Sequence, residues 1–579
     1  MQLSSRLFLS SVTSLAVAAL ASGCGTSGPS AAVGGTSGTT GGANNVGGTG
    51  VPSGGATSGG SGGSNAGGTA PSDGGSSTGA APNGGSANVG GAAPAGGESG
   101  SSGGDGSGGS VPVERPTLVT SGANDYWKVG ELTAGSGAAT ITVNATSTKQ
   151  KWIGFGGTFN EAGWDALSVL FEVDRARAIA LLFSPSEGAN FKWGRVPIGA
   201  SDYAVDRYTL NESAGDYTMS MFSIARDQMR LIPYIHAAQG VKPDIKFWAS
   251  PWTPPSWMKE PAQIDGTDAG PNGEAATFTA HMKDDDQTLE AYALYFVKFV
   301  QAYAAENIVI DHVHPQNEPG YATRYPSCRW DSGLLGKFVG DFLGPAFEAN
   351  NLETGIFFGT LSNNDDAIYS GNIGGLLGGS ANPDARGYVT GVGLQWNTIA
   401  RIPSILSAAP DMLILQTEHR CGNYPFTVAG APAFNPDKPQ NDHAYAIESW
   451  GYIRDWIKAG ANGYSAWNMV LDTVGKSIDA QRPWPQNALL TVDRQAKTLI
   501  PTPAYYVFRH FSYFVDPEAV RVDVSGGDAV AFKNPDGSLV AVVYNSGSQP
   551  ASTTVAMGSS TYQVQVPAQG WATLNVKGE

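Results

Sequence analysis

The sequence predicts an α/β protein, a (β/α)8 TIM barrel with a small β-sandwich side domain formed by sequence from both ends of the folded region. Short apolar runs alternate with amphipathic stretches eight times between residues 151 and 500, which is the pattern of a barrel of parallel strands. Short strand-like segments separated by turns fill residues 501–579, and residues 112–150 hold further strands ahead of the barrel. A Gly/Ser-rich segment precedes all of this and ends near residue 111.

The first 111 residues predict an export signal followed by a disordered tether. Arg6 precedes the apolar run 7–21, which is too short to span a membrane and is typical of a signal peptide, here residues 1–23. Cys24 ends a stretch that resembles a bacterial lipoprotein cleavage box, so we expect it to carry a lipid anchor; a simple secretory signal is the alternative. Residues 24–111 hold too few apolar side chains to fold and form a flexible linker. We therefore expect an exported protein, either an outer-membrane or cell-surface lipoprotein or a secreted one, whose contact with the membrane is limited to that lipid.

Eight short runs rich in β-branched and aromatic residues are the expected barrel strands. In chain order they are residues 153–159, 191–198, 245–249, 308–313, 355–359, 388–392, 411–418 and 464–468. The first contains Gly154, Gly156 and Gly157, which allow close approach of the neighbouring backbone.

Helical periodicity separates these runs. Before the fourth strand, apolar residues fall on one helical face at positions 289, 292, 293, 296, 300 and 303. Before the eighth, Ala446, Trp450, Ile453 and Ile457 do the same, and Gly460 is the expected end of that helix. We interpret these aromatic residues as core rather than as ligand contacts.

The pattern changes after residue 501. Strands are expected at 519–524, 529–533, 539–544, 562–566 and 571–576, with turns such as Asn534-Pro535-Asp536-Gly537 between them. The alternating segment 139–143 is expected to join the same sheet, which would bring both ends of the folded region together.

Glu318 follows the fourth predicted strand, between Asn317 and Pro319. Because proline disfavours helical backbone at the residue before it, we expect Glu318 to be extended. A carboxylate fixed at the end of a buried strand, beside an amide donor, is how a catalytic acid would be mounted. The alternative is an ordinary strand-end turn, since Asn, Pro and Gly are turn residues.

A second carboxylate stands in the same position 100 residues later, because the seventh predicted strand ends in Glu418. A strand–helix unit takes roughly 30 residues or more, so this separation suits three such units. The carboxyl ends of all barrel strands open on one face, and we expect Glu318 and Glu418 to face each other there. Sequence does not give their separation, which would distinguish retention from inversion.

The composition excludes several classes of function. The net charge of −16 disfavours a nucleic-acid partner. The seven histidines form no metal-binding spacing with each other or with cysteine, so neither a metal nor another cofactor is expected. The three cysteines leave a pair once Cys24 is set aside. Cys328 and Cys421 each follow one of the two glutamates, so we expect a disulfide between them; two separate buried thiols are the alternative.

Two carboxylates without a metal suit glycoside hydrolysis, in which one donates a proton and the other attacks carbon or activates water. The loop after the third strand carries Trp248, Trp252 and Trp257, whose flat faces suit sugar rings, although core packing explains any one of them as well. Arg195 and Asp202 flank the end of the second strand and could bind hydroxyls or pair with each other. Trp467 ends the eighth strand, beside Glu418.

Six motifs together resemble one known family. They are Gly154-Phe155-Gly156-Gly157, Arg195-Val196-Pro197, Ala249-Ser250-Pro251-Trp252, Asn317-Glu318-Pro319, Gln416-Thr417-Glu418 and Trp467-Asn468-Met469-Val470-Leu471. Their order is similar to that of glycoside hydrolase family 30, the glucosylceramidase family, over the region from Pro112 to the C-terminus. The resemblance implies a retaining β-glycosidase on a barrel with a β-sandwich.

The resemblance also implies residue roles. Glu318 matches the family's acid/base and Glu418 its nucleophile, while Asn317 matches the residue that holds the sugar 2-hydroxyl. Four more residues match positions that line the first sugar subsite: Arg195, Asp202, Trp252 and Trp467.

Two loops depart from the lysosomal glucosylceramidases, namely residues 419–423 and the segment Gln395-Trp396-Asn397. We expect Gln395 and Asn397 to bind substrate, but ceramide as leaving group is placed in doubt. A carbohydrate partner, a β-glucoside or β-glucan, is expected. The alternatives are an endo-β-1,6-glucanase or a xylanase of the same family, and a surface glycan-binding protein without activity, which would not need both carboxylates.

Overall fold

The computed structural model describes residues 114–266, 280–331, 333–362, 369, 373, 383–419, 442–479 and 486–578. All of them belong to one compact unit, Gly106–Glu579. The predicted signal peptide, Cys24 and the whole predicted tether lie outside the described residues, as does Cys421. Within the described part of the chain, no helix combines the length and apolar character that crossing a bilayer requires.

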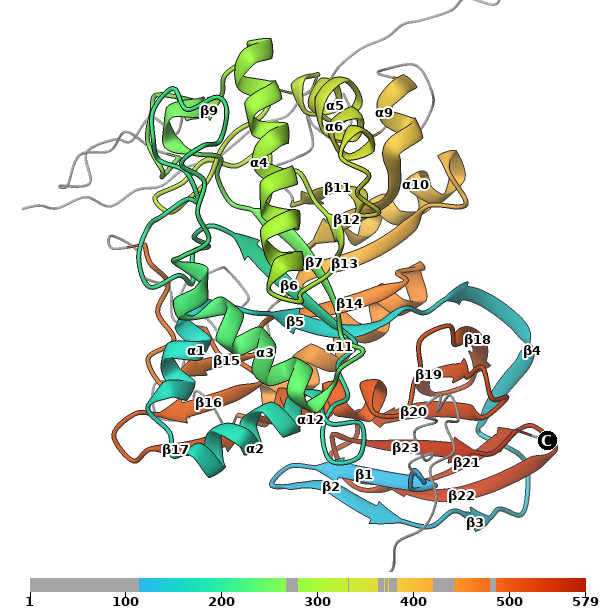
Figure 1. Ribbon diagram of the computed structural model, residues 1–579. Coiled ribbons are helices and arrows are strands. Elements are labelled where there is room, and N and C mark those ends of the chain that lie inside the picture. Colours follow the sequence, from blue (N-terminus) through green and yellow to red (C-terminus); the bar gives the residue numbers. More distant parts are fainter. Residues whose placement is uncertain are drawn as a thin grey trace, which may run out of the picture. The chain divides into compact units, whose positions relative to one another are not determined.

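A closed barrel of eight parallel strands forms the centre of this unit and confirms the predicted fold class (Figure 1). Around the barrel the order is β10, β11, β12, β13, β14, β5, β6 and β7. In chain order the strands are β5 (Gly154–Thr158), β6 (Trp193–Ile198), β7 (Lys246–Pro251), β10 (Ile310–Val313), β11 (Gly355–Leu361), β12 (Val389–Gln395), β13 (Leu413–His419) and β14 (Gly463–Asn468). Each of the eight predicted runs overlaps one of them.

The fourth strand is shorter than predicted. β10 begins at Ile310, and Val309 is 73% exposed although it belongs to the apolar run. Its neighbours Ile308 and Ile310 are buried, so this run has one exposed residue between two buried ones.

Glycine in β5 allows the strands to approach closely. A Cβ atom on Gly156 would lie 2.2 Å from the carbonyl oxygen of Trp193 in β6. No side chain larger than hydrogen fits there without moving the neighbouring backbone.

Helices surround the barrel. They are α1 (Glu161–Ser168), α2 (Glu172–Phe183), α3 (Leu231–Val241), α4 (Asp286–Ala305), α5 (Leu334–Lys337), α6 (Gly344–Ala349), α9 (Pro383–Tyr388), α10 (Ile402–Ala408), α11 (His443–Ala459) and α12 (Pro503–Ser512). The predicted apolar faces of α4 and α11 are buried. Gly460 follows α11 with φ of +116°, the left-handed conformation expected of a helix end.

Short helical turns and small sheets complete the barrel region. The turns are η1 (Asp227–Met229), η2 (Ser256–Met258), the π-helical η3 (Phe338–Leu343) and η6 (Thr398–Arg401). Two small sheets that the sequence pattern did not predict are formed by β8 (Lys259–Glu260) with β9 (His281–Met282), and by β15 (Val470–Asp472), β16 (Leu490–Asp493) and β17 (Thr498–Pro501).

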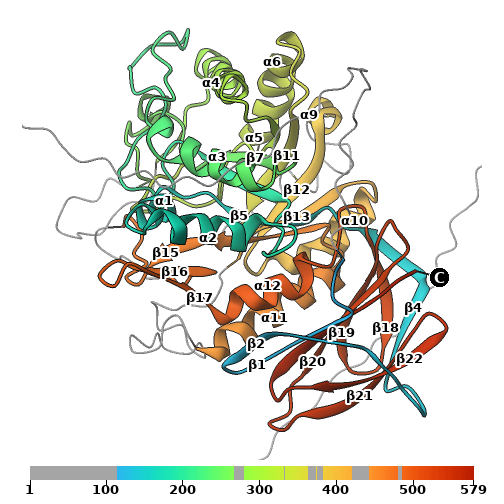
Figure 2. The same cartoon turned by 60° about the horizontal axis from the view of Figure 1, so that its bottom comes forward.

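The β-sandwich is a ten-stranded sheet built from both ends of the folded region (Figure 2). Its strands are β1 (Leu118–Gly122), β2 (Asp125–Gly130), β3 (Thr133–Ala134), β4 (Ile141–Lys151), β18 (Val520–Ser525), β19 (Asp528–Lys533), β20 (Leu539–Asn545), β21 (Ala551–Met557), β22 (Ser560–Val566) and β23 (Gly570–Val576). The predicted strand near Ile141 does join this sheet, since β4 pairs with β18 and β21.

Helix α12 joins the barrel to the sandwich. Thr502 caps its N-terminus by accepting a hydrogen bond from the Tyr505 amide, and its apolar side chains belong to the barrel core. His510 is fully buried on this helix, and its ring nitrogens bond the hydroxyls of Ser121 in β1 and Thr573 in β23. The side domain is therefore fixed to the barrel by buried contacts.

Candidate active site

Glu318 lies just beyond the carboxyl end of β10, but its backbone is not extended as predicted. Its φ is +47°, in the left-handed region that residues other than glycine rarely adopt. The Glu318 amide donates to the Thr360 carbonyl at 2.9 Å, and its own carbonyl accepts from the Tyr321 amide at 2.8 Å. The proline rule excludes right-handed helix only, and these hydrogen bonds select the left-handed alternative.

Glu418 sits near the end of β13, and only 5% of it is exposed. Its Oε2 accepts from Arg195 Nη1 at 2.5 Å and from Gln395 Nε2 at 3.2 Å. Burial raises the pKa of Glu418, while the charge of Arg195 and a hydrogen bond from the Trp396 side chain oppose that rise. One oxygen is thus held in place, and Oε1 carries neither of these two bonds.

Arg195 connects the two strand ends. It is fully buried in β6, and its Nη2 donates to Asn317 Oδ1 at 2.6 Å and to Ser250 Oγ at 3.0 Å. Its guanidinium carbon lies 4.3 Å from the ring centre of Trp252 and 5.3 Å from that of Trp467. Aromatic faces of this kind stabilise a cation that has lost its water.

Asn317 presents a fixed amide. Its Oδ1 accepts from Arg195, from Thr360 Oγ1 at 2.9 Å and from Gln395 Nε2 at 2.8 Å. Arginine can only donate, so the atom facing it must be the amide oxygen. The amide nitrogen is then free of these bonds and can donate to a ligand.

Asp202 is 5% exposed and does not form the alternative ion pair with Arg195, whose partner is Glu418. Burial, with the negative charge of Glu418, raises the pKa of Asp202 well above its usual range. Oδ1 of Asp202 is buried without a hydrogen-bond partner among the described residues. A protonated carboxyl group with an unused oxygen can exchange hydrogen bonds with a hydroxyl.

Aromatic side chains form a wall beside these polar groups. The rings of Trp252 and Trp467 stack at 5.4 Å, and Tyr203 meets Trp467 edge-on. These three residues form a small apolar cluster with Tyr325, Leu471 and Ala488, separate from the barrel core. Trp252 also donates a side-chain hydrogen bond to Asp202.

The segment after β12 is only partly as predicted. Gln395 is buried and bonds both Glu418 and Asn317, so it orients protein groups. Asn397 is exposed and makes none of these bonds. The residue that sequence reasoning missed here is Trp396, whose amide donates to the Glu418 carbonyl at 3.3 Å.

Three other contributors were also missed. Tyr325 donates to Glu318 Oε2 at 3.4 Å, and Ser250 and Thr360 bond Arg195 and Asn317. Ser250 belongs to the motif Ala249-Ser250-Pro251-Trp252, so the sequence did contain a signal for it. Tyr325 and Thr360 carry no local signal, since they reach the site from another loop and another strand.

Cys328 is fully buried, and it forms no disulfide with another described residue. Burial raises its pKa to about 12, which makes it an unreactive thiol. Its predicted disulfide partner, Cys421, lies outside the described residues, and the pairing stays a prediction that thiol counting on native and reduced protein can test.

The arrangement can support acid–base and nucleophilic chemistry on a polar ligand. A buried carboxylate is paired with arginine, a second carboxylate lies next to Asn317, and an aromatic wall borders both. Such a set suits a sugar ring, which has apolar C–H faces and a rim of hydroxyl groups.

Comparison with known proteins agrees with this geometry. The glycosyl hydrolase family 30 TIM-barrel domain matches residues 152–515, and the family 30 beta sandwich domain matches residues 518–574. A lysosomal acid glucosylceramidase of Mus musculus is 26% identical over 479 residues, which cover 77% of this chain and 86% of that protein. An endo-1,6-beta-D-glucanase of Aspergillus fumigatus is 26% identical over 438 residues, covering 72% and 84%.

The solved structure of SrfJ from Salmonella typhimurium superposes with a TM-score of 0.67 at 22% identity, covering 80% of this chain and 99% of that one. It shares the fold. The family match spans both the barrel and the sandwich, and the chain therefore belongs to glycosyl hydrolase family 30 and is an O-glycosyl hydrolase.

Proposed function

We propose that the chain hydrolyses β-glucosyl bonds with retention of configuration. Glu418 is the nucleophile and Glu318 the acid/base. The observation that carries this assignment is the chain of hydrogen bonds from Glu418 Oε2 through Arg195 to Asn317, the neighbour of Glu318. It links the strand end that carries Glu418 to the residue beside Glu318, which supports a shared site for the two carboxylates.

In the first step Glu418 attacks the anomeric carbon while Glu318 gives its proton to the leaving oxygen. In the second step Glu318 takes a proton from water, and the resulting hydroxide displaces Glu418 from the sugar. Arg195 and Gln395 fix the Oε2 atom of Glu418, which directs Oε1 to the carbon. The free amide nitrogen of Asn317 is placed to donate to a sugar hydroxyl beside the reacting carbon.

The relatives' names support a glucosyl residue at this position, because glucosylceramidase and 1,6-beta-glucanase both act on β-linked glucose. The expected export and tether favour a polysaccharide or a released glycoside over a sphingolipid. An endo-β-1,6-glucanase is thus the second candidate, with the same chemistry and a longer substrate.

The test compares two isosteric variants. Glu418→Gln should lose nearly all turnover on every substrate, since the covalent step needs the carboxylate. Glu318→Gln should keep much more activity on aryl β-glucosides with acidic phenol leaving groups than on alkyl β-glucosides, because an acidic phenol needs no proton to leave. Glu353→Gln, an exposed glutamate before β11, is the matched control and should behave like the parent.

Near-parental turnover in Glu418→Gln would remove it as the nucleophile. Equal loss on both classes of substrate in Glu318→Gln would remove it as the acid. Assaying aryl β-glucoside, the β-1,6-glucan pustulan, xylan and glucosylceramide side by side then identifies the substrate class.

A further inference from the structure

Asn160 stands between β5 and α1, at the N-cap position of the helix, yet its side chain does not cap the helix. Its backbone is extended, with φ of −99° and ψ of 144°, and its side chain makes no cap hydrogen bond. Asparagine is favoured at this position because its side-chain oxygen usually accepts a hydrogen bond from an amide of the first turn. Asn160 is 2% exposed, and a buried polar side chain needs partners elsewhere.

The Asn160 side chain finds those partners on the two neighbouring strand ends. Its Nδ2 donates to Asn468 Oδ1 at 2.8 Å, and its Oδ1 accepts from Ser201 Oγ at 2.9 Å. In the barrel β5 lies between β14 and β6. Asn468 is the last residue of β14, and Ser201 lies three residues beyond the end of β6. The side chain thus fastens together the two strand ends that flank its own.

These bonds continue into a closed hydrogen-bond circuit. Asn468 Nδ2 donates to Gln486 Oε1 at 2.9 Å, and the Gln486 amide donates to the Gly475 carbonyl at 2.8 Å. The Tyr203 hydroxyl donates to the same carbonyl at 3.3 Å, and the Tyr203 amide donates to Ser201 Oγ at 3.1 Å. The circuit therefore joins segments that are far apart in the sequence, namely residues 160, 201–203, 468, 475 and 486.

The circuit runs beside two residues that border the proposed sugar position. Asp202 stands between Ser201 and Tyr203, and Trp467 directly precedes Asn468. The rings of Tyr203 and Trp467 meet edge-on with their centres 5.9 Å apart. A shift of residues 201–203 relative to the end of β14 would therefore move the carboxyl group and the aromatic wall relative to each other.

We propose that Asn160 is a positioning residue that sets the places of Asp202 and Trp467 around the sugar; the proposal rests on the glycoside hydrolysis argued above. A planar amide with a bond on each side holds the two strand ends at one separation. Such precision matters because a misplacement of about 1 Å can cost about 10²-fold in rate. The alternative is a residue that only stabilises the start of α1, and the missing cap bond disfavours it.

Three single variants separate the two roles. Asn160→Ala removes both bonds. Asn160→Ser keeps a residue type that caps helices as well as asparagine does, but its hydroxyl is too close to the backbone to reach both strand ends. Ser201→Ala removes one of the bonds from the other side and keeps Asn160. The measurements are kcat and KM on aryl β-glucoside, together with the thermal midpoint of unfolding.

The value of kcat/KM should fall roughly 10- to 100-fold in Asn160→Ala and Asn160→Ser alike, and by a smaller factor in Ser201→Ala. The loss should lie mainly in a higher KM, because Asp202 and Trp467 would hold the sugar in the ground state as well as in the transition state. A residue that only capped α1 would be replaced by serine without loss. A parental KM in folded Asn160→Ser would therefore overturn the proposal, even if Asn160→Ala did not fold.

A double-mutant cycle with Asp202→Ala tests the route of the effect. If Asn160 acts by placing Asp202, its removal should cost much less once the carboxyl group is gone. We expect Asn160→Ala to lower kcat/KM about threefold in the Asp202→Ala background, compared with roughly 10- to 100-fold in the parent. The same factor in both backgrounds would contradict the proposal.

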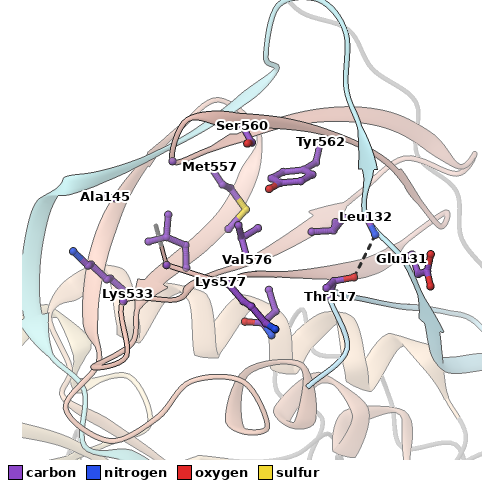
Figure 3. Close-up of a pocket in the computed structure, with 15 residues that line it drawn as sticks. Thr117, Glu131, Leu132, Ala145, Lys533, Met557, Ser560, Tyr562, Val576 and Lys577 are labelled. Carbon is purple, nitrogen blue, oxygen red and sulfur yellow. Dashed lines mark hydrogen bonds between the residues drawn. The ribbon is translucent and has the colours of Figure 1, made fainter. Parts of the chain in front are cut away.

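Two variants serve as controls. Asn575→Ala removes another asparagine that joins distant segments, since its Nδ2 donates to the Pro116 carbonyl at 3.4 Å, but this residue lines a pocket in the β-sandwich (Figure 3). Asp285→Ala removes a genuine N-cap bond, the one from the Thr288 amide at the start of α4. Both should keep the parental kcat and KM, and Asp285→Ala should lower the thermal midpoint. An equal rise of KM in either control would overturn the proposal, because the effect would then follow from general destabilisation.

The two proposals fail in different ways. If the parent hydrolyses no β-glycoside, the proposed function fails. If the parent hydrolyses a β-glycoside and both Asn160→Ser and Ser201→Ala keep the parental KM, only the positioning role of Asn160 fails.

Discussion

Replacing Arg195 by methionine should reduce kcat/KM at neutral pH by roughly 10²- to 10³-fold. Methionine keeps an apolar stem between the tryptophans but removes the guanidinium, which lies 2.5 Å from Glu418. The remaining carboxylate is 5% exposed, so water cannot replace the lost partner. Losing one preorganised donor in a water-excluded active site costs roughly 10²- to 10³-fold in rate. Removing one member of a buried ion pair also costs about 3–5 kcal/mol of folding stability.

The pH dependence gives the sharper test. Burial raises the pKa of Glu418 and Arg195 opposes that rise, so the variant's pKa must move further upward. The nucleophile must be charged, and the acid limb of kcat/KM should therefore shift to higher pH. The native variant also keeps a proton that the unfolded chain has released, so its free energy of unfolding should fall as pH rises above the ordinary carboxyl pKa.

The assay measures kcat/KM on aryl β-glucoside and the thermal midpoint across about pH 4–9. Arg494→Met is the matched control, because Arg494 pairs with Asp165 and Asp472 at the surface, where such bridges contribute about 0–1 kcal/mol. An acid limb that coincides with the parent's would refute the reasoning, since Arg195 would then have no electrostatic hold on Glu418.

Three further outcomes are expected. Asp202→Asn should lose less than about tenfold in kcat/KM, and Asp202→Ala should lose clearly more. Burial and the charge of Glu418 raise the pKa of Asp202, and the neutral amide of asparagine mimics the protonated acid. Equal losses in the two variants would contradict this. Asp227 is fully buried and its pKa is raised to about 7, so its native carboxyl holds a proton that the unfolded chain releases above its ordinary pKa. Urea unfolding should therefore show the parent losing stability between about pH 4 and pH 7 and Asp227→Asn losing less, whereas parallel curves would exclude Asp227. Gly156→Ala should abolish soluble folding, because its Cβ atom would lie 2.2 Å from the Trp193 carbonyl oxygen. The control is Gly240→Ala in α3, where the new Cβ atom meets open space; it should raise the free energy of unfolding by about 0.5–1 kcal/mol in the same assay.

The barrel could be predicted because its signals are local. Each strand is a short apolar run, and α4 and α11 carry their apolar faces at helical spacing. The placement of Glu318 and Glu418 after such runs followed from the same pattern. Val309 shows the limit of this kind of prediction. It is an apolar residue in an apolar run, yet it is exposed, and it lies before the first residue of β10.

The backbone of Glu318 could not be predicted from its neighbours. The proline rule concerns one steric clash, whereas the observed conformation depends on a hydrogen bond to Thr360, which belongs to β11. Trp396 and Tyr325 were missed for the same reason. Their contribution depends on which strand ends and loops lie side by side, and a single sequence does not show which of them are neighbours.

Two buried carboxyl groups, Glu418 and Asp202, share one buried cation, Arg195, and this explains how their charges can differ. Arg195 donates a hydrogen bond directly to Glu418, whereas it acts on Asp202 through its charge at longer range. Desolvation acts on both, but only Glu418 receives the compensating ion pair, so the pKa of Asp202 stays well above its usual range. A raised pKa favours the neutral acid, which can give a hydrogen bond to a sugar hydroxyl, while Glu418 is the proposed nucleophile. The tryptophans around Arg195 keep water out and so maintain this division.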